Sequence, residues 1–123
     1  MPTATTGGAK LYDPEEWTRE ALEAYAAKWD HHLDMGIVKA VKVLRDNNIA
    51  TTECCEGGDG HACRWPTVRF VGSPGEAWKA VGWLLDWQLP VRYLGLRWAF
   101  DPIASCLPNG PEWYVEFREK IDV

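Results

Sequence analysis

The sequence predicts an α+β fold, a two-layer sandwich in which a mainly antiparallel sheet of about four strands carries helices on one face. Two observations lead to this prediction. Apolar residues recur at helical spacing in three segments, and four further segments have the pattern of strands. The order of these segments is α-α-β-β-α-β-β, and strands joined as hairpins favour antiparallel pairing.

The chain of 123 residues fits one domain with one core. We expect residues 1–12 to be a disordered tail, because they are small and polar without periodicity, and 13–123 to form a single α+β domain. The first helix is predicted to begin with Asp13 as N-cap, Pro14 in the first helical position and Glu16 completing a capping box. Its apolar stripe comprises Leu22, Tyr25, Ala26 and Trp29.

A second helix is predicted from Asp30 or Leu33 to Asp46, and Asn47-Asn48 provides a stop because Asn tolerates the left-handed conformation. The residues expected to face the core are Leu33, Ile37, Ala40, Val41 and Leu44. The residues expected to face outward are Lys39, Lys42 and Arg45.

Two strands are predicted at Ile49–Cys54 and Pro66–Val71, with a Gly-rich loop between them. A third helix follows, with Ser73 as N-cap, Pro74 next and Glu76 completing a capping box. Its apolar residues are Ala77, Trp78, Val81, Trp83, Leu84, Leu85 and Trp87.

The C-terminal part predicts two more strands, separated by a long loop from Asp101 to Pro111. The strand Val91–Phe100 alternates, with one set of side chains on the core side: Leu94, Leu96, Trp98 and Phe100. The last strand is expected to turn three side chains inward: Trp113, Val115 and Phe117.

The same alternation predicts which side chains cover the other face of the sheet, here called the outer face. They are Thr67, Arg69, Val71, Tyr93, Gly95, Arg97, Tyr114, Glu116 and Arg118. Arg and Tyr together suit phosphates and stacked bases, because guanidinium groups bind oxyanions and rings stack. Two alternatives remain: a solvated face on which Arg and Glu pair across strands, and a homodimer interface.

Composition excludes some functions. The net charge of −5 argues against non-specific binding to nucleic acids, but it permits a local basic patch for one small anion. The sequence contains no apolar run of about 18 residues that would span a membrane, and its N-terminus lacks a signal-peptide pattern. Adjacent cysteines rarely pair, so reduced thiols in the cytoplasm are expected.

The segment from Thr51 to Phe70 is the candidate functional site. Its glycines Gly57, Gly58 and Gly60 allow consecutive amides to approach an anion. The acidic residues of this loop oppose a phosphate and suit a cation, a ribose hydroxyl or the donor edge of a base. No Lys-Ser/Thr follows the glycines, which excludes a P-loop, and a simple tight turn is the alternative.

Thiol and imidazole groups in the segment raise two other hypotheses. Zinc could be bound by Cys54, Cys55, His61 and Cys63. Against this, the spacing is not a paired CxxC, and adjacent residues of a strand point to opposite faces. Cys55 activated by His61 could act as a nucleophile, but the sequence does not bring the two side chains together. The sequence therefore favours binding over catalysis, without a cofactor.

The run Thr52-x-x-Cys55-x-Gly57-Gly58-x-Gly60-His61, followed by P-T-V-R-F at 66–70, resembles a family of small uncharacterised phage and prophage proteins. The family pattern has Ser where this chain has Cys54, and Cys63 lies outside it. The similarity covers about residues 37–72. It implies a small protein that acts in the cytoplasm of a host cell, by evading host defence or sequestering a signalling nucleotide.

The first hypothesis is thus a phage-type binding protein that holds a small anionic, nucleotide-like ligand. The predicted ligand-binding residues are Cys55, Glu56, Gly57, Gly58, Gly60, His61, Trp65 and Arg69. The alternatives are an inhibitor that binds a host protein, and a zinc-binding or Cys-dependent enzyme using Cys55 and His61.

Overall fold

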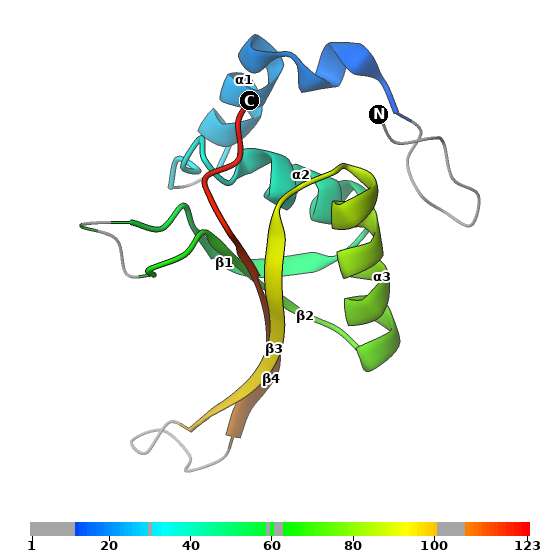
Figure 1. The fold of residues 1–123 in the computed structure, drawn as a ribbon, viewed down its shortest axis with the longest axis vertical. Coiled ribbons are helices and arrows are strands. Elements are labelled where there is room, and N and C mark those ends of the chain that lie inside the picture. Colours follow the sequence, from blue (N-terminus) through cyan, green and yellow to red (C-terminus); the bar gives the residue numbers. More distant parts are fainter. Residues whose placement is uncertain (1–11, 30, 59, 61–62, 101–107) are drawn as a thin grey trace.

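A four-stranded antiparallel sheet and a layer of helices make up the fold, which confirms the predicted α+β class and order of elements. The structure is a computed structural model that describes residues 12–123 apart from 30, 59, 61–62 and 101–107. The strands are β1 (Ala50–Cys55), β2 (Thr67–Val71), β3 (Val91–Phe100) and β4 (Pro108–Phe117), in the spatial order β1-β2-β4-β3 (Figure 1). The helices are the 3-10 helix η1 (Pro14–Trp17) and the α-helices α1 (Arg19–Ala27), α2 (Val38–Asp46) and α3 (Pro74–Asp86).

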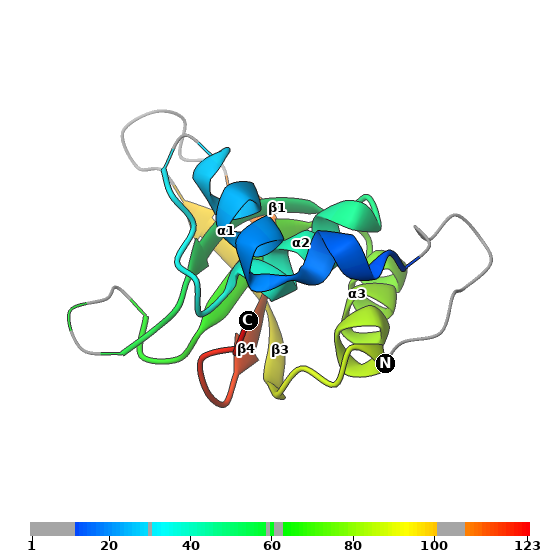
Figure 2. The same ribbon diagram turned by 90° about the horizontal axis from the view of Figure 1, so that it is seen from above.

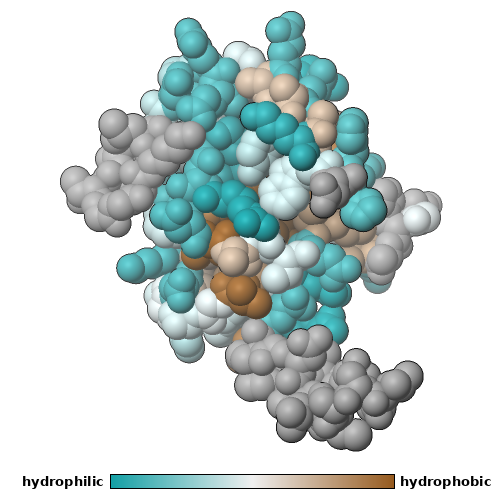
Figure 3. Space-filling model, turned by 180° about the vertical axis from the view of Figure 1, so that it is seen from behind, coloured by the Kyte–Doolittle hydropathy of each residue, from teal (hydrophilic) through white to brown (hydrophobic). Residues whose placement is uncertain are grey.

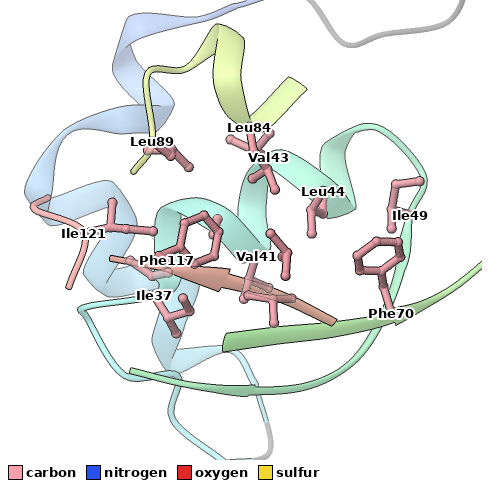
Figure 4. Close-up of a cluster of buried hydrophobic side chains, with 14 of the residues drawn as sticks. Ile37, Val41, Val43, Leu44, Ile49, Phe70, Leu84, Leu89, Phe117 and Ile121 are labelled. Atoms are coloured by element: carbon pink, nitrogen blue, oxygen red, sulfur yellow. The ribbon is translucent and has the colours of Figure 1, made fainter. Parts of the chain in front are cut away.

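Helix α2 is central to the helical layer, since it contacts α1, α3 and β1 (Figure 2). The core lies between these helices and one face of the sheet, where Val68 and Phe70 of β2 and Val115 and Phe117 of β4 are fully buried (Figure 4). They pack with buried residues of the helical layer: Leu22, Ile37, Val38, Val41, Leu44, Ala77, Ala80 and Leu84. Because side chains alternate along a strand, their neighbours point to the outer face.

The predicted first helix is wrong in one respect, because it is two helices separated at Thr18. Asp13 caps η1 as expected, although its carboxylate accepts a hydrogen bond from the Glu15 amide (3.0 Å). The Thr18 hydroxyl accepts a second cap bond from the Ala21 amide (3.1 Å) and starts α1. Thr18 is extended and is itself a good N-cap, so the chain begins a new helix there.

The second helix begins later than predicted. Residues 33–37 precede α2 without helix, and 35–37 form a turn closed by the Ile37 amide donating to the Asp34 carbonyl (3.1 Å). The Leu33 amide donates to the Ala26 carbonyl (3.2 Å). Leu33 and Ile37 are nevertheless buried, as predicted. Their apolar pattern therefore predicted their burial correctly, although neither residue is part of the helix.

The prediction that Lys42 faces outward is wrong, since its side chain is buried and Lys42 is only 4% exposed. Its ammonium group forms ion pairs with Asp46 (2.7 Å) and Glu16 (3.3 Å). It also lies over the rings of Trp17 (4.5 Å) and Tyr25 (5.4 Å). The physical reason is that η1 and α1 cover the polar side of α2, so the lysine is buried together with partners that satisfy it.

The remaining elements agree with the sequence except at one boundary, since β4 begins at Pro108, inside the loop predicted from Asp101 to Pro111, where the chain extends its pairing with β3. Helix α3 begins with the predicted capping box, in which the Ser73 hydroxyl accepts from the Glu76 amide and the Glu76 carboxylate accepts from the Ser73 amide. On β3, Leu94 packs against the core, but Leu96 is 46% exposed, which contradicts its predicted burial. The hairpin of β3 and β4 extends beyond the helical layer (Figure 1), so no helix covers this position. The side chains of Trp98 and Phe100 lie outside the described part.

The free edge of β1 is interrupted at Thr51, and one of its backbone carbonyls is bound by a side chain. A register shift between Thr51 and Glu53 interrupts the ladder with β2. The Arg45 guanidinium donates to the Thr51 hydroxyl (2.6 Å) and to the Thr51 carbonyl (2.7 Å). At the end of the strand, the Asp34 carboxylate accepts from the Glu56 amide (3.3 Å).

The surface is mostly hydrophilic. Figure 3 shows the back of the molecule, where hydrophilic side chains surround a small hydrophobic patch. Among the residues that the structure describes, no helix has the length and apolar character needed to cross a bilayer.

Candidate functional site

The Gly-rich loop is built as a turn whose two arms touch. Gly57 has φ +78°, and a side chain there would stand 2.6 Å from the backbone nitrogen of Pro66 and from the carbonyl carbon of Trp65. The next amide, of Gly58, donates to the Arg64 carbonyl (3.2 Å). Gly57 is therefore required by close backbone approach as well as by its positive φ.

The amides of this loop are engaged within the protein. The Glu56 amide donates to the Asp34 carboxylate (3.3 Å), the Gly57 amide to the Cys55 sulfur (3.4 Å) and the Gly58 amide to the Arg64 carbonyl (3.2 Å). Three successive N–H groups thus have separate acceptors and do not converge on one point. An anion site formed by backbone amides needs donors that converge on one point, so these three amides do not support the predicted anion site at the loop.

The other predicted residues of the loop are placed differently. The Glu56 carboxylate accepts from the Gly36 amide (3.1 Å) and pairs with the Lys120 ammonium (3.2 Å), which ties the C-terminal segment to the loop. Gly60 is exposed, with φ +82° and open space around its Cα. His61 lies outside the described residues. The loop is therefore, in its described part, a structural connection.

The cysteines of β1 point to opposite sides of the sheet. Cys54 lies opposite Val68, which is buried on the core side, and Cys55 lies opposite Thr67 of the outer face. Burial, followed by the charge of nearby Asp34, raises the pKa of Cys54 to about 11. The register thus confirms that adjacent residues of this strand separate, which was the argument against Cys54 and Cys55 sharing one zinc ion.

No metal site is assembled by the residues that the structure describes, since no three His, Cys, Asp or Glu side chains are grouped for one ion. Burial and the neighbouring Cys55 also raise the pKa of Cys63. Thiols with a raised pKa are protonated at neutral pH, which weakens them as nucleophiles and as metal ligands.

The outer face contains an aromatic surface that lies flat on the sheet. Gly95 of β3 and Tyr114 of β4 are partners in the ladder. A side chain at residue 95 would meet the Tyr114 ring at 2.3 Å, so the ring covers the glycine. The Tyr93 ring lies beside it, 5.9 Å away between ring centres. A ring held flat by a facing glycine is a suitable surface for stacking.

Arginines surround this ring. Arg69 is the partner of Tyr114 on β2, and Arg97 lies two residues beyond Gly95 on β3. A hollow of about 340 Å³ opens here, lined by Cys63, Arg64, Trp65, Thr67, Arg69, Arg97, Tyr114 and Glu116. A smaller hollow of about 200 Å³ adjoins it and shares Cys63, Thr67 and Arg69. Of the predicted ligand-binding residues, Trp65, Arg69 and Cys55 line these two hollows.

Carboxylates pair with several of these arginines, as the solvated-face alternative requires. Arg69 pairs with Glu53 across β1 and β2, and the guanidinium of Arg97 lies 4.0 Å from the Glu112 carboxylate. Arg64 forms no ion pair with any described residue. The face is therefore mixed in charge, and Arg64 is the arginine lining the hollow that pairs with no described carboxylate.

The Trp65 ring is already in contact with cations. The Arg92 guanidinium lies 4.4 Å from its ring centre and the Arg64 guanidinium 5.5 Å away. Arg92 is fixed in turn by Glu116 (2.8 Å). Trp65 thus positions guanidinium groups, and Tyr114 offers the better stacking surface. Tyr114 was predicted to lie on this face, whereas no alternation in the sequence indicates Arg64, which precedes β2.

A third hollow, also of about 340 Å³, lies on the other side of β1, beneath the connection between α1 and α2. Its polar lining includes His31, His32, Asp34, Glu53 and the half-buried Cys54. Its two carboxylates disfavour an anion, and no arginine is among the described residues that line it. The outer face is therefore the better candidate for the ligand that the sequence predicts.

Comparison with known proteins adds no further identification. No protein-family model matches the chain, and no curated protein or solved structure matches it significantly. The similarity to phage proteins stays a prediction. A function for this protein must therefore be inferred from the geometry of the outer face.

Proposed function

We propose that this protein binds a small anionic ligand with a flat ring, of the nucleotide class, on the outer face of its sheet. The observation that carries the proposal is the Tyr114 ring lying on Gly95 in a hollow lined by Arg64, Arg69 and Arg97. The site lies beside the Gly-rich loop, and its arginines, in place of the loop amides, would bind the anion.

The chemistry of the hollow matches such a ligand. Guanidinium groups bind phosphate oxygens through paired charge-assisted hydrogen bonds. Stacking of a base on an aromatic ring contributes about 1–3 kcal/mol. The hollow of about 340 Å³ is at the small end of the range of ligand pockets, which suits one nucleotide unit.

The carboxylates on this face oppose the ligand only weakly. Exposed Arg–Glu pairs contribute about 0–1 kcal/mol, so a phosphate can replace a carboxylate as the partner of Arg97 or Arg69 at small cost. Arg64 supplies a cation that no described carboxylate engages. Affinity should accordingly fall as salt concentration rises.

A binding role fits the context that the sequence similarity implies. A small phage-type protein that holds a signalling nucleotide would act by sequestration inside a host cell.

The test is binding of a nucleotide panel to the purified chain. Native mass spectrometry of protein taken from cells would show any retained ligand, and calorimetry would then measure cyclic and linear nucleotides. Replacing Arg97 with Gln should weaken binding by about tenfold or more, because one charge-assisted hydrogen bond contributes about 1.5–3 kcal/mol. Tyr114→Leu should weaken binding of base-containing ligands but not of inorganic phosphate.

Arg19→Gln is the matched control, since Arg19 pairs with Glu23 on the exposed surface of α1 and should leave affinity unchanged. No retained ligand together with no heat across the panel would contradict the proposal. Equal losses for Arg97→Gln and Arg19→Gln would contradict the placement of the site.

A second candidate function is binding of a host protein through α3. Trp78 is 74% exposed and Leu85 is 54% exposed. They lie on the exposed surface of the helix, whereas Ala77, Ala80 and Leu84 are buried. Exposed Trp is the side chain most often found at the centre of binding sites between proteins.

Replacing Trp78 with Ala is expected to abolish recovery of a stoichiometric partner from a host lysate, while Arg97→Gln should retain it. Lys79→Ala, one position along the same helix, is the control for a general change of the surface. Analytical ultracentrifugation of the pure chain distinguishes a second copy as the partner. A partner recovered equally by the Trp78→Ala variant would exclude this surface.

A further inference from the structure

Two thiols meet at the base of the Gly-rich loop. Cys55 and Cys63 line the hollow of about 200 Å³ together with Glu53, Cys54, Thr67 and Arg69. Burial raises the pKa of the Cys63 thiol, and Cys55 is near enough to raise it further, while Thr67 and Arg69 lower it. The Cys55 sulfur also accepts a hydrogen bond from the Gly57 amide at 3.4 Å, which helps to fix its position.

These two cysteines lie on the two arms of the loop, and the fold holds these arms together. Cys55 is paired with Thr67 in the ladder of β1 and β2. The Gly58 amide bonds to the carbonyl of Arg64, the residue after Cys63. Contacts of the folded chain therefore hold the two cysteines on neighbouring arms of the loop, beside the same hollow.

We propose that Cys55 and Cys63 form a reversible dithiol–disulfide couple that reacts with low-molecular-weight disulfides. This goes beyond ligand binding and does not depend on it. Disulfides in reducing compartments are usually transient and redox-sensing, which is the class of site that a half-buried thiol pair fits.

The reaction balances with one disulfide, RSSR, as the oxidant. One cysteine thiolate attacks a sulfur of RSSR, so a protein–SR bond forms, the S–S bond of RSSR breaks and RS⁻ leaves. The second cysteine thiolate then attacks the protein sulfur, the Cys55–Cys63 bond forms and a second RS⁻ leaves. Two electrons pass to RSSR, and the two thiol protons are carried by the two RSH products.

Cys54 serves as an internal reference for this couple. It is adjacent to Cys55 but lies on the core side of the sheet, and its pKa of about 11 keeps it protonated at neutral pH. Burial and Cys55 raise the pKa of Cys63, whereas Thr67 and Arg69 lower it. Because the raising causes dominate, exchange should accelerate as pH rises above neutrality.

The experiment exposes the full chain to oxidised glutathione, quenches with acid, alkylates the remaining thiols and maps the fragments. Cleavage after Glu56 separates Cys55 from Cys63, so a disulfide between them joins two fragments. The wild-type chain should give the joined fragments and two released thiols. Cys55→Ser and Cys63→Ser should each give a glutathione adduct that persists about tenfold longer or more, because the intramolecular attack is lost.

Cys54→Ser should form the couple as the wild type does. The proposal would be overturned by lasting wild-type adducts without joined fragments, or by joined fragments that disappear in Cys54→Ser. It would also be overturned by a stoichiometric metal ion released when the thiols are modified. Using both single variants keeps the result interpretable if one of them folds poorly.

Discussion

Replacing Gly57 with alanine is expected to lower the free energy of unfolding by about 2–4 kcal/mol. Two causes add. The residue holds φ +78°, which an alanine adopts only with strain. The new methyl group would also stand 2.6 Å from the backbone of Trp65 and Pro66, and backbone atoms cannot turn aside as a flexible side chain can. Urea unfolding followed by tryptophan fluorescence measures the difference.

Gly58→Ala is the matched control, because it has nearly the same strain without the contact. Its φ is +96°, and no atom lies within 4 Å of where its side chain would stand. We expect a loss of about 1 kcal/mol for this variant, which reflects the backbone strain alone. Equal losses at residues 57 and 58 would show that the arms of the loop do not touch as described.

Replacing Lys42 with methionine is expected to cost about 2–4 kcal/mol of stability. The ammonium group is buried and neutralises Asp46 and Glu16, whose carboxylates would remain without it. Because methionine keeps most of the side-chain volume, the loss of stability would come from the missing charge and not from poorer packing. The contacts with the Trp17 and Tyr25 rings would weaken too, since they require a cation.

Lys39→Met is the control on the same helix, at a position that is only partly buried, and should change stability by less than about 1 kcal/mol. The double variant Lys42→Met with Asp46→Asn should recover part of the loss, because it removes the unpaired carboxylate as well. Equal effects of the two lysine substitutions would contradict the buried ion pairs.

The fold was largely predictable because local signals and tertiary structure agree. Ser73 and Glu76 form the predicted cap, and the alternation of Val115 and Phe117 correctly identified the buried face of β4. Helical periodicity identified buried residues even at Leu33, where the chain is not helical. Burial is set by apolar character, so it can be inferred where secondary structure cannot.

Lys42 and Thr18 show what the sequence could not decide. A lysine on the polar side of a helix normally faces water, and only the packing of η1 and α1 over α2 buries this one. Thr18 became a cap because the chain turns there to lay α1 against α2, whereas Asp13 and Pro14 suggested one continuous helix. Both outcomes depend on contacts between elements, which periodicity within one element does not contain.

The candidate site was predictable in part. Alternation correctly placed Arg69, Arg97 and Tyr114 on one face. The flat ring could have been inferred only from the register that sets Gly95 opposite Tyr114, and register depends on the long connection before β4. The loop glycines predicted an anion site formed by their amides. The amides of Gly57 and Gly58 instead donate to acceptors within the protein, which the composition of the loop does not reveal.

The engaged edge of β1 limits how copies of this protein can assemble. A polymer that grows by strand addition needs two receptive edges on every copy, one for each neighbour. The Arg45 guanidinium binds the Thr51 carbonyl and the register shift interrupts the ladder, and both hinder strand addition at β1. The other edge of the sheet is β3. We therefore expect growth by strand addition to end at a pair of copies joined through β3.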